Sequence, residues 1–413
     1  MDHAKQNIPE RFHGLDALRG GALLLGVVLH ATMSFFPVQI WIIADSDTSA
    51  VASGLFFVIH TFRMMTFFLI AGLFAHLALH RKGLWRFVRD RLARIAGPLF
   101  AFWPIVFPAI VAVFIWAAWV ANGGSFPEES PPSPSFSIES FPLTHLWFLW
   151  VLLVFYVGLL LVWIPASILD RRSFIGRIMD HGIALMTGVL GPFILAIPLA
   201  VALYATPGWV MWFGIPTPDQ SLIPNTAALT GFGTAFLFGF LLHRQPDLLE
   251  RLRRQWMILT VMAIASVTAS MLLAGGAVPT FMMAENDLDK ALQAGLYAFT
   301  AFAATFACIA LALQFFRGRS PIRRYLADAS YWIYIVHLPI IMVGQVWVSG
   351  MPGPWWLKLG GLLTVSLLLM LVSYELIVRH TFIGRFLNGK RIPWRRADAT
   401  PDQPATAMGA STS

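Results

Sequence analysis

The sequence is poor in cysteine and in charged residues. Its 413 residues include a single cysteine, Cys308, and only 12% of them are charged, whereas 57% are hydrophobic. One cysteine excludes an intrachain disulfide. No soluble domain of this size buries so much apolar surface, and apolar runs of about 20 residues are far longer than barrel strands. Together with a mean hydropathy of +0.69, these shortages predict an all-α, polytopic integral membrane protein.

Several catalytic and binding motifs are also missing. The sequence has no H-E-x-x-H or comparable pair of metal ligands, no G-x-S-x-G turn and no Walker loop. We therefore expect no metal ion and no permanently bound cofactor. The sequence pI of about 10.0 does not indicate nucleic-acid binding, because the lysines and arginines form short clusters between apolar runs.

Ten apolar runs are long enough to cross a bilayer. They cover residues 15–36, 54–79, 96–120, 146–164, 181–204, 226–243, 256–274, 294–316, 328–349 and 357–378. We expect them to form one ten-helix membrane domain over residues 1–396. The last residues, 397–413, have the composition of a disordered tail.

The connections between these runs alternate in charge. Basic clusters occur at 81–94, 171–177, 244–254, 317–324 and 385–396, and acidic residues occupy the other connections at Asp45, Asp47, Glu128, Glu129, Glu139, Asp219, Glu285, Asp287 and Asp289. The positive-inside rule then predicts a multi-pass protein of the inner (plasma) membrane with both termini in the cytoplasm. In the outer connection 205–225, Trp209 and Trp212 are expected either at the membrane interface or stacked on sugar rings.

The first run carries ionisable residues at positions where lipid would disfavour them. Arg19 and His30 are eleven residues apart, so on a helix they lie within roughly 20° of each other and about 16 Å apart along the axis. Asp16 falls on nearly the same face. Because such groups are costly inside a membrane, they usually mark a functional path, although a structural histidine bonded to a neighbouring helix is the alternative.

The second and ninth runs add further candidates. His60 and Arg63 are one helical turn apart, and Arg63 is expected at a depth similar to that of His30, where the two can share a pocket. In the ninth run, His337 follows Tyr334 by one turn, and His337 is either a pocket residue or a hydrogen-bonded packing residue. His145 is expected to be a boundary residue. Glu375 is expected to pair with Arg19 or Arg379.

These residues suit acyl transfer. A neutral imidazole in an apolar pocket remains available as a base, because a low dielectric disfavours its charged form. It can take a proton from a hydroxyl while that oxygen attacks an activated acyl group. A nearby arginine can stabilise the oxyanion that develops. Arg19, at the cytoplasmic end of the same face, can hold the phosphates of a cytosolic donor.

Four segments make the chain similar to a known family. RFHGLDALRGGALLLGVVLH, FRMMTFFLIAGLF, HLWFLWVLLVFY and SYWIYIVHLPI resemble the acyltransferase-3 family of integral membrane acyltransferases, especially its glucan-biosynthesis C-type members, over most of residues 11–390. The resemblance implies ten core helices that pass an acyl group, such as acetyl or succinyl, from cytosolic acyl-CoA to a hydroxyl of an extracytoplasmic glycan. It also implies that His30 is the catalytic histidine, that Arg19 is its paired basic residue, and that Arg63 is the arginine of the second run.

Two other functions are compatible with the same residues. A transporter or flippase can use buried His and Arg side chains as a proton relay. The lack of an internal repeat, and of a carboxylate within the membrane near His30, argues against it. A non-catalytic membrane subunit or sensor is the second alternative.

Overall fold

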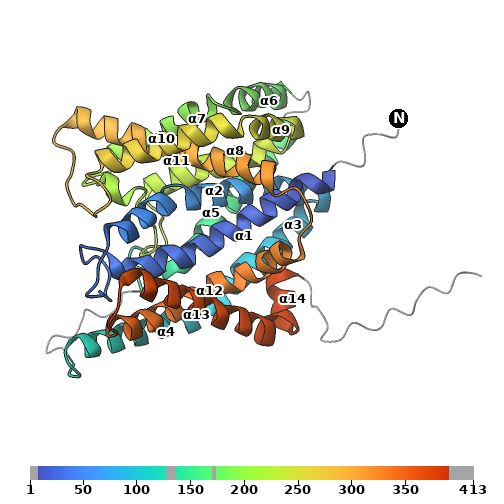
Figure 1. Ribbon diagram of the computed structural model, residues 1–413. Coiled ribbons are helices and arrows are strands. Elements are labelled where there is room, and N and C mark those ends of the chain that lie inside the picture. Colours follow the sequence, from blue (N-terminus) through green and yellow to red (C-terminus); the bar gives the residue numbers. More distant parts are fainter. Residues whose placement is uncertain (1–7, 127–135, 170–173, 390–413) are drawn as a thin grey trace, which may run out of the picture.

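The computed structural model describes residues 8–126, 136–169 and 174–389, and every regular element in these ranges is a helix (Figure 1). The α-helices are α1 (Ile8–Thr32), α2 (Ala50–Lys82), α3 (Leu84–Arg91), α4 (Gly97–Ala121), α5 (Trp147–Leu169), α6 (Phe174–Met186), α7 (Gly191–Ala205), α8 (Thr226–Leu242), α9 (Pro246–Arg254), α10 (Trp256–Leu273), α11 (Asp287–Phe315), α12 (Pro321–Ser349), α13 (Trp355–Ser373) and α14 (Phe382–Asn388). Short 3₁₀ turns cover Met33–Phe35, Thr144–Leu146 and Met211–Phe213, and π-helical turns cover Leu92–Ala96 and Tyr374–Arg379. The tail expected at 397–413 lies outside the described residues.

The helix ends follow local sequence signals. Side chains of Ser49, Asn225, Asn286 and Ser320 accept hydrogen bonds from the first turns of α2, α8, α11 and α12, which satisfies backbone donors that have no partner inside the helix. Gly83, with φ of 76°, ends α2 and lets the chain turn into α3.

Eight helices of the described chain are long and apolar enough to cross a membrane, or up to ten if each of two bent pairs forms one span. The all-helical membrane fold predicted from composition is therefore confirmed. The bent pairs are α6 with α7, at 101°, and α8 with α9, at 116°.

The span expected at 181–204 is not one continuous helix but falls on the bent pair α6 and α7. The chain breaks between Met186 and Gly191, where Gly188 has φ of 115° and Pro192 stands in the first turn of α7. A positive φ is compatible with glycine but interrupts a helix, and proline is favoured where a new helix begins.

The basic helices α3, α9 and α14 lie near the same end of the bundle as the first residues of α1 (Figure 1). The connections that hold Asp45 and Glu285 lie at the opposite end. The basic and acidic connections that alternate along the sequence therefore lie at opposite ends of one bundle.

Helices α2 and α8 pack closely because a glycine of each helix faces the backbone of the other helix. A methyl group on Gly72 would overlap the carbonyl oxygen of Phe236, and one on Gly239 would overlap that of Leu69. Small residues of this kind allow helix backbones to approach in membranes, where burial of apolar surface drives no association.

The tryptophans of the connection between α7 and α8 are core residues. Trp209 and Trp212 are 4% and 2% exposed, and the Trp212 ring stacks on Phe56 of α2 with 5.8 Å between ring centroids. Trp209 Nε1 donates a hydrogen bond to the carbonyl oxygen of Gly214 at 2.7 Å. The expectation of an interfacial belt or an open sugar-stacking surface is therefore wrong, since the connection folds back onto α2.

Candidate active site

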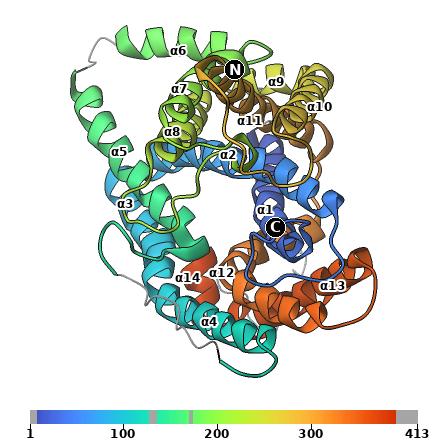
Figure 2. The same ribbon diagram turned by 90° about the vertical axis from the view of Figure 1, so that its left-hand side faces the viewer.

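Two cavities lie between the same four helices, α1, α2, α5 and α12, which surround the centre of the molecule in Figure 2. The first has a volume of about 280 Å³, is lined by His30, His60 and Arg63 among others, and is here called the His30 cavity. The second has a volume of about 480 Å³, is lined by Arg19 and Tyr334 among others, and is here called the Arg19 cavity. Of the two site residues predicted in α1, Arg19 therefore lines one cavity and His30 lines the other.

The structure brings His30, His60 and Arg63 together. The guanidinium of Arg63 occupies the space beside Gly26 of α1 that a side chain there would fill. Arg63 forms no ion pair within the described residues, and its Nε has no hydrogen-bond partner there. The His60 ring stacks on Phe56 with 5.2 Å between centroids. The cavity therefore has a cation available to an anionic group that enters it.

The backbone of His30 is held by a hydrogen-bonded pair of side chains. Gln345 of α12 donates from Nε2 to the carbonyl oxygen of His30 at 2.8 Å. Trp41, in the connection after α1, donates from Nε1 to Gln345 Oε1 at 3.0 Å. Because Gln345 is fully buried, both bonds are shielded from water, and they fix the end of α1 against α12.

His337 and His145 pack beside His30. The ring centroids of His30 and His337 are 5.2 Å apart, and those of His145 and His337 are 4.9 Å apart. Nδ1 of His337 lies 2.7 Å from the carbonyl oxygen of Tyr334, and a carbonyl can only accept, so the neutral ring carries its hydrogen on Nδ1. Its Nε2 is then an acceptor, and it is buried without a partner among the described residues. His337 is thus both hydrogen-bonded and next to the cavity.

The expectation that His145 is a boundary residue is wrong. It is 7% exposed, and its Nε2 lies 3.0 Å from the carbonyl oxygen of Ile335. The hydroxyl of Tyr334 donates to the carbonyl oxygen of His145 at 2.7 Å. Tyr334 also lines the Arg19 cavity, and His145 lines the His30 cavity, so this hydrogen bond joins a residue of one cavity to a residue of the other. His337 packs between their rings and that of His30 but lines neither cavity.

A carboxylate also lines the His30 cavity. Asp219 comes from the connection between α7 and α8 and lies outside the candidate membrane spans, to which the expectation about carboxylates near His30 refers. Burial raises the pKa of the Asp219 carboxyl above its ordinary value, although a hydrogen bond from Gln220 Nε2 at 3.2 Å acts in the opposite direction.

The Arg19 cavity has a basic lining. Arg19 pairs with Asp16 at 3.3 Å and lies over the ring of Phe74, 5.3 Å from its centroid. Arg91 donates from Nη1 to the hydroxyl of Tyr156 at 3.2 Å. Arg81, Lys82 and Arg94 also line this cavity. Glu375 pairs with Arg379 at 2.7 Å, so of the two partners expected for it, Arg379 is the one observed.

Comparison with known families agrees with this geometry. A model of the acyltransferase-3 family, described as an acyltransferase domain, matches residues 12–375. The chain belongs to the acyltransferase-3 family. The resemblance inferred from the four sequence segments is thus confirmed, and all six predicted site residues lie within the matched range.

Among curated proteins, this acyltransferase-3 chain is similar to the glucans biosynthesis protein C of Escherichia coli (strain K12) and to that of Shigella boydii serotype 4. Each is 28% identical over 156 residues, which is 38% of this chain and 39% of the relative. The match thus spans about two fifths of the length of these relatives. No solved structure matches the chain.

Proposed function

We propose that the protein transfers an acyl group, acetyl or succinyl, from cytosolic acyl-CoA to a hydroxyl of an extracytoplasmic glycan, across the inner (plasma) membrane. The observation that carries this proposal is the shared cavity of His30 and Arg63 in a member of the acyltransferase-3 family. Both termini and the basic helices α3, α9 and α14 face the cytoplasm in this scheme, which follows from the positive-inside rule.

The donor enters the Arg19 cavity. Its phosphates carry negative charge, and Arg19, Arg81 and Arg91 supply the complementary charge. The walls deeper in the cavity are apolar and aromatic, for example at Phe67, and suit the acyl end. The thioester then lies beside Tyr334, on the side of the Arg19 cavity that adjoins the His30 cavity, because the Tyr334 hydroxyl bonds to His145 of that cavity.

His30 is the general base of the transfer. It takes the proton of the acceptor hydroxyl as that oxygen forms a bond to the thioester carbonyl carbon. Arg63 stabilises the tetrahedral oxyanion. When the carbon–sulfur bond breaks, the thiolate of CoA takes the proton from His30, and the ester remains on the glycan. His337, whose ring centroid lies 5.2 Å from that of His30, packs against the base and orients it, and His60 lines the entry of the acceptor.

A transporter or flippase is the alternative, and Asp219 is the observation that favours it, because a carboxylate that lines the same cavity as His30 can take part in a proton relay. The two functions differ in detergent, where no gradient exists. An acyltransferase releases free CoA from acetyl-CoA or succinyl-CoA and acylates an added glucan oligosaccharide. A transporter does neither.

Replacing His30 tests the catalytic step. His30→Gln keeps a similar volume but cannot cycle a proton, and a positioned base typically contributes about 10² to 10⁴ in rate. We therefore expect a loss of that order in glucan acylation, measured by mass spectrometry. The matched control is His181→Gln in α6, a histidine that lines neither cavity. A folded His30→Gln protein with parental turnover would remove the base from His30.

Replacing Arg19 tests the donor site. Arg19→Ala should weaken CoA binding in calorimetric titration, while the control Arg254→Ala, an exposed arginine of α9, should not. Arg19→Lys should recover only part of the affinity, because a guanidinium that binds phosphate bidentately becomes a point charge. Equal CoA affinity of Arg19→Ala and the parent would contradict this assignment.

A further inference from the structure

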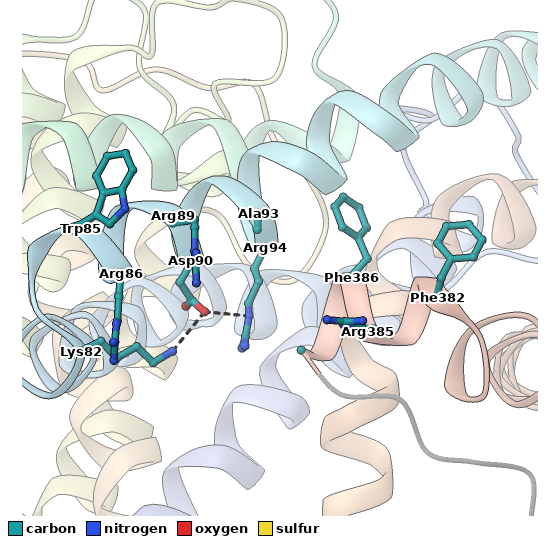
Figure 3. A pocket seen from close by; sticks show the side chains of 11 residues that line it. Lys82, Trp85, Arg86, Arg89, Asp90, Ala93, Arg94, Phe382, Arg385 and Phe386 are labelled. Atoms are coloured by element: carbon teal, nitrogen blue, oxygen red, sulfur yellow. Dashed lines mark hydrogen bonds and ion pairs between the residues drawn. The ribbon is translucent and has the colours of Figure 1, made fainter.

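A second basic cleft lies at the same end of the bundle as the Arg19 cavity. It has a volume of about 990 Å³ and is formed by the end of α2, by α3 with the π-turn that follows it, and by α14 (Figure 3). The cations that line it are Lys82, Arg86, Arg89, Arg94 and Arg385, and the carboxylate that lines it is Asp90. The proposed acyl transfer makes no use of Arg86, Arg89 or Arg385.

The cleft has an excess of positive charge that the described chain does not neutralise. Asp90 is already shared by Lys82 at 3.2 Å, Arg91 at 3.0 Å and Arg94 at 3.1 Å. Arg86, Arg89 and Arg385 are exposed and form no ion pair within residues 8–126, 136–169 and 174–389. Three guanidinium groups therefore remain to bind an anion of another molecule.

The aromatic side chains of the cleft place it at a membrane surface. Trp85 and Phe382 are 76% and 78% exposed. In Figure 3 the rings of Trp85, Phe382 and Phe386 point to one side of the cleft, and the charged ends of Arg86, Lys82 and Arg94 point to the other. Rings on one side and cations on the other are typical of segments at the boundary between lipid tails and headgroups.

The length of the helical segment that contains α3 also places the cleft at the membrane surface. Leu84–Ala121 runs for 38 residues, which is about 57 Å at 1.5 Å per residue, whereas the hydrocarbon core is about 30 Å thick. Since α4 is the apolar part, the polar α3 extends beyond the hydrocarbon into the headgroup region.

We propose that this cleft binds the phosphate headgroup of an anionic phospholipid, with Arg86, Arg89 and Arg385 on the phosphate and Trp85 and Phe382 in the adjoining acyl region. Charge complementarity and the exposed rings favour a lipid over a free phosphate ester, which needs no apolar side. The site is separate from the proposed donor site, although the two cavities share Lys82 and Arg94.

The test is native mass spectrometry of the full chain in detergent, titrated with phosphatidylglycerol or with phosphatidylcholine of the same chain length. The parent should bind phosphatidylglycerol more tightly. The triple variant Arg86→Gln/Arg89→Gln/Arg385→Gln should bind it about 100-fold more weakly, since each arginine near an anionic surface contributes roughly fivefold. The matched control, Arg254→Gln/Arg319→Gln/Arg324→Gln, removes the same charge from exposed arginines outside the cleft and should bind like the parent.

Two further measurements separate the sources of the phosphate. Adenosine 3′,5′-bisphosphate, the nucleotide end of CoA, should bind the parent and the cleft variant equally. If the cleft variant lost this nucleotide instead of the lipid, or if both triple variants bound phosphatidylglycerol alike, the proposal would be overturned.

Two further variants cover the case in which the glutamine triple variant does not fold. Arg86→Lys/Arg89→Lys/Arg385→Lys keeps the charge and should retain most of the preference for phosphatidylglycerol. Loss of that preference would contradict the proposal. The pair Arg86→Gln/Arg385→Gln should weaken phosphatidylglycerol binding at least threefold, and parental binding by this pair would overturn it.

Discussion

Gly26 gives Arg63 its place in the His30 cavity. The guanidinium lies where a Cβ on residue 26 would stand, so Gly26→Ala must displace it. We expect a loss of acyl transfer of about 10-fold to 100-fold, because a small misplacement of a group that stabilises the transition state is costly. Glucan acylation by the purified variant measures this effect.

The control for this substitution is Gly21→Ala in the same helix, where no atom lies within 4 Å of the new methyl group. Alanine is more favourable than glycine in a helix by about 1 kcal/mol, so this control should fold at least as well as the parent and remain active. If Gly26→Ala were equally active, the position of Arg63 would not matter for transfer.

Asp219 makes stability depend on pH. Its raised pKa means that folding favours the protonated acid, so its contribution to stability is greatest below the ordinary pKa of about 3.9 and is lost as the pH rises through the folded value. Asp219→Asn remains neutral at every pH. It should therefore raise the Tm at pH 7, and the difference from the parent should shrink toward pH 4. Glu285→Gln, at an exposed position, should show neither effect, and a Tm of Asp219→Asn that is lower at pH 7 would refute this reasoning.

The sequence predicts site residues where a polar side chain stands inside an apolar run, because lipid makes such a side chain costly. His30, Arg63 and His60 stand out because they interrupt apolar runs, and the structure places them in one cavity. The sequence does not indicate the burial of His145, because this residue begins its run, where a polar residue needs no explanation. Its burial results from the contact with α12, and no periodicity along the chain indicates such a contact.

At the scale of elements, the connection after α1 is fixed to α13 by a buried ion pair. Lys358 Nζ lies 2.7 Å from Asp45 Oδ1, and both side chains are buried. Lys358→Met leaves the carboxylate of Asp45 buried and unpaired, which should cost about 3–5 kcal/mol. The double variant Asp45→Asn/Lys358→Met should recover part of this loss, because the amide is uncharged and can still accept from the backbone N–H of Asp47. Thermal unfolding of the two variants checks this order, and a double variant less stable than Lys358→Met would contradict it.

Hydrophobic runs predicted most of the helices but not the bend between α6 and α7. The run 181–204 is apolar on both sides of Gly188, and composition alone does not distinguish a straight helix from two helices joined at a glycine. The signals that mark the break are Gly188 and the Gly191-Pro192 pair, which are local and therefore readable in the sequence. The direction of the new helix is set by packing against α11 and α8.

At the scale of the whole molecule, the number of spans depends on the two bent pairs. Helix α7 has 15 residues, about 22 Å, and is too short to cross a hydrocarbon core of about 30 Å alone. Helix α6 meets it at 101°, so the two count as one span only if the bent pair as a whole crosses. If each pair spans, the basic helices α3, α9 and α14 all lie on one side of the membrane, as the positive-inside rule requires.

This arrangement makes a topology prediction that reporter fusions can decide. Fusions at residues 85 and 320, in or beside basic segments, should report the cytoplasm, and those at 130 and 285 should report the outside. Fusions at 180 and 245 should report the cytoplasm and one at 215 the outside, because α6–α7 and α8 then each cross once. A cytoplasmic signal at 215 would reduce the count to eight spans and place Asp219 on the donor side. A reversal at 85, 130, 285 or 320 would contradict both the orientation and the proposed direction of acyl transfer.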